Sequence, residues 1–183
     1  MKLETKRLIL RSIEERDRKD LIENISNLNV SRYLLVVPHP YTDADADFWI
    51  KHCAEEAGKK PRKNYEIAIE LKSEGRVIGG VGFTKVDLFQ EKAEIGYWLG
   101  EKYWRQGIMS EAVEKMLDFA FNELNLRRVE AGTFAENLAS QRLLEKFGFR
   151  KEGIKRQGYR AKATGKIHDD VLYGLLKDEY LQK

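Results

Sequence analysis

Apolar and polar residues alternate in several short segments, as they do in strands with one buried face. The clearest is 65–71, where Tyr65, Ile67, Ile69 and Leu71 share one face. The same alternation recurs at 93–99, with Glu94 on the face opposite the apolar residues. We expect strands at 7–11, 65–71, 76–83, 93–99, 127–134, 149–156 and 171–176.

Other segments carry apolar residues at helical spacing. The stripe that begins at Ala112 and Val113 predicts a helix over 107–124, and a second helix is expected from Asn137 to a stop at Gly148. A capping-box pattern at Thr42 predicts a helix ending at Gly58. A polar helix or a pair of turns is expected at 14–28.

This order of elements predicts an α/β fold of the α+β type with a mostly antiparallel sheet. No Pro-rich or Ser-rich linker interrupts the chain, so we expect a single domain over 1–183. Gly79, Gly80 and Gly82 weaken the strand that contains them and indicate a bulge or a close backbone approach.

Composition favours a globular protein without a nucleic-acid or membrane partner. The chain has 183 residues, with 33 basic against 30 acidic side chains, and its net charge of +3 is too balanced for a polyanion binder. Cys53 is the one cysteine, which fits a reducing compartment. No apolar run resembles a signal peptide or a membrane span, so we expect a cytoplasmic protein.

Two common binding-site motifs, for dinucleotides and for zinc, do not match this sequence. Gly80-Val81-Gly82 begins like a dinucleotide fingerprint, but Lys85 occupies the place of the third glycine and a strand follows. The three histidines have no zinc-binding spacing with Cys53, and no metal is expected.

The segment 94–112 carries the most chemical information. It is a strand, a short basic turn with Lys102 and Arg105, and then a helix that begins at Gly107. The first amides of a helix have no intrahelical acceptor and lie at its positive end, so phosphate oxygens bind there well. An ordinary strand–helix connection explains the same pattern, and this segment alone does not decide between them.

A second segment, 128–149, is a strand, an asparagine, an amphipathic helix, a glycine stop and an aromatic residue. Together the two segments resemble the GCN5-related N-acetyltransferase (GNAT) superfamily, and more closely its RimJ/RimL-like branch. The marks are Glu94-Ile-Gly-Tyr-Trp-Leu99, Gly107-Ile-Met-Ser-Glu-Ala112, Asn137-x-x-Ser140 and Glu145-Lys-Phe-Gly-Phe149, with further likeness at 5–11 and 170–175.

The resemblance implies a mixed, mostly antiparallel sheet of about seven strands, flanked by about four helices, in which two central parallel strands splay apart. Acetyl-coenzyme A (acetyl-CoA) would lie in the gap. When the family's residue roles are transferred to the matching positions, the pantetheine arm would contact backbone groups of Tyr97, Trp98 and Leu99. It would also contact the side chain of Asn137. The phosphates would be bound by Arg105, Gln106, Gly107, Ile108, Met109 and Ser110, with Arg142 near the 3′-phosphate.

Three positions depart from the superfamily pattern. Trp104 stands where Gln or Arg is usual, and Met109 stands where Gly or Ala is usual. Backbone amides would bind the phosphates, so both side chains are tolerable. Leu144 occupies the place of a tyrosine that often protonates the departing thiolate, which leaves Ser140 as the candidate for that role.

The reaction implied is direct attack of a primary amine on the thioester. An amine of pKa near 10 is mostly protonated at neutral pH, so a base or a water relay must take protons. Glu94 is our candidate base and Glu130 the reserve, although a salt bridge or solvent exposure explains either residue equally well.

The sequence does not identify the amine acceptor, which could be a protein N-terminus, a polyamine, an aminoglycoside or another small amine. Asp43, Asp45 and Asp47 fit a polyamine site or simply the first turn of a helix. The alternatives to an enzyme are a non-catalytic acyl-CoA-binding or regulatory module and a generic phosphate-binding protein. The resemblance implies a homodimer. Residues that could line the acceptor cleft, or simply pack, are Tyr33, His39, Tyr41, Trp49, Tyr159 and Arg160.

Overall fold

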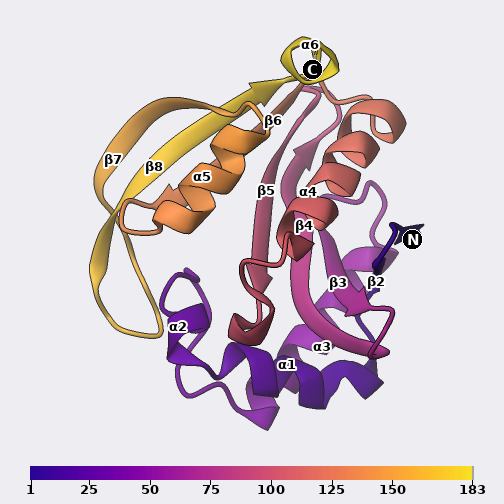
Figure 1. The fold of residues 1–183 in the computed structure, drawn as a ribbon, viewed down its shortest axis with the longest axis vertical. Coiled ribbons are helices and arrows are strands. Elements are labelled where there is room, and N and C mark those ends of the chain that lie inside the picture. Colours follow the sequence, from indigo (N-terminus) through magenta and orange to yellow (C-terminus); the bar gives the residue numbers. More distant parts are fainter. Residues whose placement is uncertain (183) are drawn as a thin grey trace.

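The structure is a computed structural model that describes residues 1–182. It contains one eight-stranded sheet in the order β1-β2-β3-β4-β5-β6-β8-β7 (Figure 1). The strands are β1 (Lys2–Glu4), β2 (Leu8–Ser12), β3 (Tyr65–Leu71), β4 (Arg76–Asp87), β5 (Lys92–Leu99), β6 (Arg128–Phe134), β7 (Arg150–Arg160) and β8 (Ile167–Leu176). The α-helices are α1 (Arg18–Ile25), α2 (Leu28–Ser31), α3 (Asp43–Gly58), α4 (Ile108–Asp118), α5 (Leu138–Lys146) and α6 (Lys177–Leu181).

Every strand pair is antiparallel except β5 with β6. This parallel pairing is short: it begins at Lys92 opposite Arg128 and ends at Glu94 opposite Glu130. Beyond that point β5 continues beside β4 alone, and β6 continues beside β8 alone. The two halves of the sheet therefore diverge, as Figure 1 shows toward the lower part of the view. The expected fold class and its splayed central pair are confirmed.

Helices cover both faces of the sheet. The apolar stripe of α4, including Val113 and Met116, packs with Leu144 of α5 in the main core, together with the odd-numbered residues Ala93, Ile95 and Leu99 of β5. On the opposite face α1 and α3 form a smaller core around Leu21, Ile25, Tyr41, Ala46 and Ile50. Alternate residues of the splayed strands thus face two different layers.

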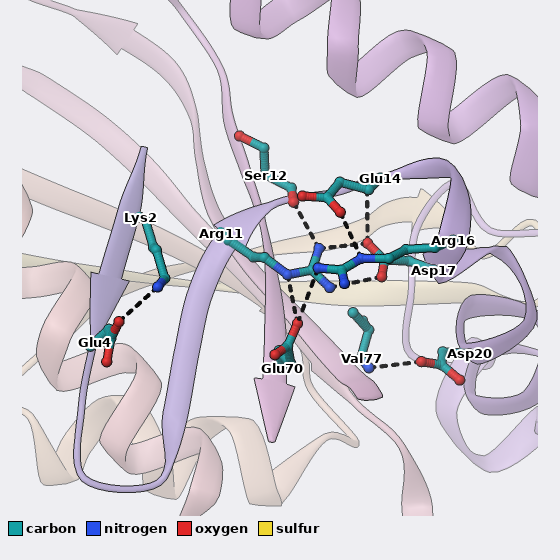
Figure 2. A network of polar contacts seen from close by, with 10 residues as sticks. All are labelled: Lys2, Glu4, Arg11, Ser12, Glu14, Arg16, Asp17, Asp20, Glu70 and Val77. Carbon is teal, nitrogen blue, oxygen red and sulfur yellow. Dashed lines mark hydrogen bonds and ion pairs between the residues drawn. The ribbon is translucent and has the colours of Figure 1, made fainter. Parts of the chain in front are cut away.

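A buried ion-pair network fixes the start of α1 against the sheet (Figure 2). Arg11 of β2 is 8% exposed and donates two hydrogen bonds to Asp17, of 2.7 and 2.8 Å, and one of 2.7 Å to Glu70 of β3. Asp20 accepts the amide of Val77 at 2.9 Å. These bonds join the first helix to strands far away in the chain.

The structure corrects the element count. There are eight strands rather than about seven, because β1 pairs with β2 although its three residues carry no strand pattern. There are six α-helices in the described chain rather than about four. The polar segment 14–28 divides into a 3-10 turn, Glu15–Asp17, followed by α1 and the start of α2. None of the helices in the described range is long and apolar enough to span a membrane.

The close backbone approach expected at the glycines of β4 is confirmed. A Cβ atom on Gly82 would lie 2.2 Å from the carbonyl oxygen of Tyr65, and one on Gly79 would lie 2.6 Å from that of Trp98. The register of β3 and β4 also shifts between Ile69 and Glu70. Any side chain at Gly79 or Gly82 would push the central strands apart.

Candidate active site

The turn before α4 has the backbone that an anion site needs. Arg105 and Gly107 have φ angles of 60° and 72°, in the left-handed region. Gly107 is the N-cap of α4, and no side chain caps the helix there. The first amides of α4 are therefore available to a ligand at the positive end of the helix.

Two side chains, those of Trp104 and Arg7, hold this turn in place. The indole nitrogen of Trp104 donates to the carbonyl oxygen of Leu99 at 2.7 Å, so the unusual residue anchors the turn to the end of β5. Arg7 donates to the carbonyl oxygen of Gln106 at 2.9 Å and to Glu111 at 2.6 Å. The Arg7 and Glu111 contacts tie the first residues of the chain to α4, which the sequence pattern did not indicate.

The residues expected to surround the phosphates lie together. Arg105, Gln106 and Gly107 are exposed, whereas Ile108 is buried in the main core and Met109 packs against it. The hydroxyl of Ser110 accepts a hydrogen bond of 3.1 Å from Lys146 at the end of α5. Lys146 thus adds positive charge to this region, and only the fold could place it there.

Asn137 caps α5, because its side-chain oxygen accepts the amide of Ser140 at 3.2 Å. The side chain can still bind pantetheine, because an amide oxygen accepts two hydrogen bonds and the amide nitrogen can donate. Arg142 is exposed on α5. The backbone of Tyr97, Trp98 and Leu99 lies beyond the last β5–β6 pair, where β5 is paired on one side.

Tyr97 and Ser140 meet across the diverging strands. Their hydroxyl oxygens are 2.9 Å apart, and either one can donate. Burial raises the pKa of Tyr97 to about 12, so the phenol stays protonated at neutral pH. A phenol that donates to Ser140 leaves the serine proton available for another acceptor. The sequence pattern had pointed only to backbone groups of Tyr97.

Glu94 and Glu130 are side by side in the parallel pair, and both are ion-paired. Lys85 donates to Glu94 at 2.6 Å, and this contact raises the pKa of the lysine. Arg128 bonds Glu130 at 2.9 Å. Lys85 has a φ of 54° at an irregularity in the β4–β5 register between Thr84 and Asp87, which directs its side chain across the strand.

Four of the residues considered for the acceptor cleft have structural contacts within the fold. Tyr41 is buried in the smaller core and Trp49 packs against it, so both have packing roles. Tyr159 pairs with His168 between β7 and β8. Arg160 donates to the carbonyl oxygen of Gly165 at 2.7 Å and thereby holds the turn between these strands.

Two further candidates lie in the helical layer. The ring of Tyr33 is covered by the guanidinium group of Arg32 at 5.1 Å. The bond between His39 and Pro40 is cis. Neither observation assigns a binding role to these residues.

The aspartates at the start of α3 serve the helix. Asp45 completes the capping box with Thr42, whose amide it accepts at 2.9 Å. Asp47 forms an ion pair with Arg18 of α1. Asp45 and Asp47 therefore both have partners within the fold.

Comparison with known proteins agrees with this geometry. Residues 7–150 match the family model described as an acetyltransferase (GNAT) domain. The chain is 36% identical over 178 residues, 97% of each chain, to an uncharacterized N-acetyltransferase p20 of Bacillus licheniformis. It is 30% identical over 118 residues, 64% of each chain, to a ribosomal-protein-serine acetyltransferase of Escherichia coli (strain K12).

A solved structure described as an acetyltransferase of the GNAT family, from Bacillus anthracis, superimposes with a TM-score of 0.81 at 27% identity, covering 98% of this chain and all (100%) of that one. The family model, the relatives and the splayed strands converge on one conclusion. The chain belongs to the GNAT superfamily and is an acyltransferase.

Proposed function

We propose that the protein transfers an acetyl group from acetyl-CoA to a primary amine by direct attack on the thioester. The observation that carries the proposal is the separation of β5 from β6 after Glu94, with the uncapped start of α4 following the end of β5. An extended cofactor arm would complete the unpaired edges of the strands. Its pyrophosphate would bind at the amides from Arg105 to Ser110.

The remaining site residues take roles that follow from their positions. Asn137 and the backbone of Tyr97 to Leu99 would hold pantetheine. Lys146, which reaches Ser110, and Arg142 would supply charge for the phosphates. Ser140 would give a proton to the departing thiolate. The Escherichia coli relative named for a ribosomal protein supports a protein N-terminus as one acceptor class to test first.

The test is release of free thiol from acetyl-CoA in the presence of a panel of N-terminal peptides and small amines, with mass spectrometry of the products. Thiol release that depends on the amine is expected. If CoA binds but no amine is acetylated, the protein is a binding module on the same fold. If CoA also fails to bind, the turn serves another phosphate compound. The homodimer and the cytoplasmic location stay predictions, and light scattering tests the former.

Binding of CoA should stabilise the protein measurably. At a CoA concentration 100 times its dissociation constant, we expect about 2.7 kcal/mol of added stability, because the ligand binds the folded chain only. A thermal melt with and without CoA measures this as a rise in Tm. An unchanged Tm at millimolar CoA would contradict the proposed cofactor site.

Replacing Gly107 by Asp should weaken CoA binding about tenfold or more. The new carboxylate would stand at the positive end of α4 and oppose the pyrophosphate. Gly165→Asp is the matched control, since Gly165 has a similar φ of 68° and open space around it. Calorimetric titration should show a loss for Gly107→Asp alone. Equal affinities in both variants would rule out this turn as the anion site.

A further inference from the structure

Asp170 of β8 is buried, and its carboxylate has no hydrogen-bond or ion-pair partner in the described part of the chain. The residue is 4% exposed, and neither a hydrogen bond nor an ion pair reaches its side chain from residues 1–182. Its neighbour Asp169, by contrast, accepts the amide of Gln157 at 2.7 Å. Leaving a buried carboxylate unpaired is costly, and such groups cluster at functional sites.

The fold places this carboxylate beside the point where the sheet opens. Asp170 is opposite Phe134 in the β6–β8 register, and its carboxylate leans over Gly132. A Cβ on Gly132 would lie 2.9 Å from Oδ1 of Asp170. Gly132 is exposed and comes two residues after Glu130, the last residue of β6 that pairs with β5. Only β6 therefore lies between Asp170 and the gap, and the Asp170 carboxylate leans over that strand at Gly132, on the same sheet face as Glu94.

Among the carboxylates near the gap, Asp170 is the best suited to accept a proton, because Glu94 is already paired with a lysine. The charged groups that face Asp170 are Lys155 of β7, Lys85 of β4 and Glu94 of β5, with His168 two residues away on β8. Lys85 is already paired with Glu94 at 2.6 Å. Burial raises the pKa of Asp170, which makes it a stronger proton acceptor than an exposed aspartate.

One other carboxylate on this face has no hydrogen-bond partner within the described chain. Glu66 of β3 has a pKa raised to about 7 by burial. It pairs in register with Gly82 of β4, and β5 lies beyond that strand. Two strands thus separate Glu66 from the gap, whereas only β6 lies between the gap and Asp170.

We propose that Asp170 is the group that accepts the proton of the acceptor amine, and that the Glu94–Lys85 pair orients the amine beside it. This rests on the proposed acetyl transfer. The ammonium form of the acceptor passes one proton to the Asp170 carboxylate. The free amine attacks the thioester carbonyl, the C–N bond forms and the C–S bond breaks. The thiolate is protonated through Ser140 at the expense of the new amide nitrogen, and Asp170 releases its proton to water.

The test compares Asp170→Asn with the native protein, using a short peptide with a free N-terminus as acceptor and thiol release as readout. At pH 7 we expect kcat/KM to fall about a hundredfold, within the range for loss of a general base. The deficit should shrink about tenfold between pH 7 and pH 9. An α-amine of pKa about 8 becomes mostly unprotonated over that range and no longer needs the base.

Two further variants serve as controls for this experiment. Asp169→Asn keeps an oxygen that can accept the amide of Gln157 and should leave the pH profile unchanged. Gly132→Ala keeps the carboxylate but displaces it, since the new methyl group would stand 2.9 Å from Oδ1. It should reproduce part of the loss. The affinity for CoA, measured by calorimetry, should be native in all three variants.

Several outcomes would overturn the assignment. A kcat/KM within twofold of native for Asp170→Asn at pH 7 would do so. A deficit that stays constant with pH would make Asp170 a positioning residue. If Glu94→Gln or Glu66→Gln, and not Asp170→Asn, shows a deficit in kcat/KM that shrinks from pH 7 to pH 9, that glutamate is the base instead. If the native protein acetylates no amine in the panel, the proposed function fails first, and the native control alone reveals it.

Discussion

Replacing Ser140 by Ala should lower kcat about a hundredfold, which corresponds to about 2.7 kcal/mol of transition-state stabilisation. The Ser140 hydroxyl is 2.9 Å from that of Tyr97, and it lies at the first turn of α5 beside the opening of the sheet. Without it, the departing thiolate has no positioned proton donor. Steady-state thiol release at saturating acetyl-CoA measures the effect.

Tyr97→Phe tests the same pair from the other side. It removes one hydrogen bond to Ser140 and should lower kcat only about threefold to tenfold, the range for one such bond. Ser73→Ala, at an exposed turn between β3 and β4, is the matched control and should be native. CoA affinity should not change in any of them. A kcat within twofold of native for Ser140→Ala would exclude the serine as proton donor.

Replacing Arg11 by Met should destabilise the fold by about 3–5 kcal/mol. The substitution leaves two carboxylates behind, those of Asp17 and Glu70, whose side chains are 3% and 13% exposed. Removing one partner of a buried ion pair costs this much because the other charge stays desolvated. The whole free energy of unfolding of such a domain is about 5–15 kcal/mol. Urea denaturation followed by circular dichroism measures the loss.

Arg16→Met is the control for this prediction. The Arg16 side chain is 66% exposed and pairs with Glu14 at 2.6 Å and with Glu70 at 3.8 Å, so its loss should cost under about 1 kcal/mol. A triple variant, Arg11→Met with Asp17→Asn and Glu70→Gln, should regain part of the lost stability because no unpaired charge is left. If the triple variant is less stable than Arg11→Met alone, the proposed cause is wrong.

The parts of the site that lie on one continuous segment could be predicted from the sequence. The turn around Gly107 and the cap at Asn137 depend on local rules for glycine and for helix ends. The splayed central pair depended on the family resemblance. The strand order and the point of separation after Glu94 were not predicted, because no short-range pattern specifies which strands pair.

Contacts between distant segments could not be predicted in the same way. Lys146 reaches Ser110, 36 residues away, and Tyr97 meets Ser140, 43 residues away. Asp170 directly precedes the strand expected at 171–176 and had no predicted role, since its burial depends on β6 and β7 on either side of β8. Likewise the ion pair between Lys85 and Glu94 depends on the irregular register of β4 and β5, which the sequence alone left open.

The bond network at the start of α4 has a consequence for the first residues of the chain. Glu111 accepts hydrogen bonds from the hydroxyl of Thr5 at 2.5 Å and from the amide of Arg7 at 2.8 Å, while Arg7 also holds the carbonyl oxygen of Gln106. Occupancy of the turn and docking of this N-terminal segment are therefore energetically linked, and the linkage is reciprocal. A cofactor that orders the turn would slow hydrogen exchange at residues 5–7, and a fusion that strains those residues would weaken its binding.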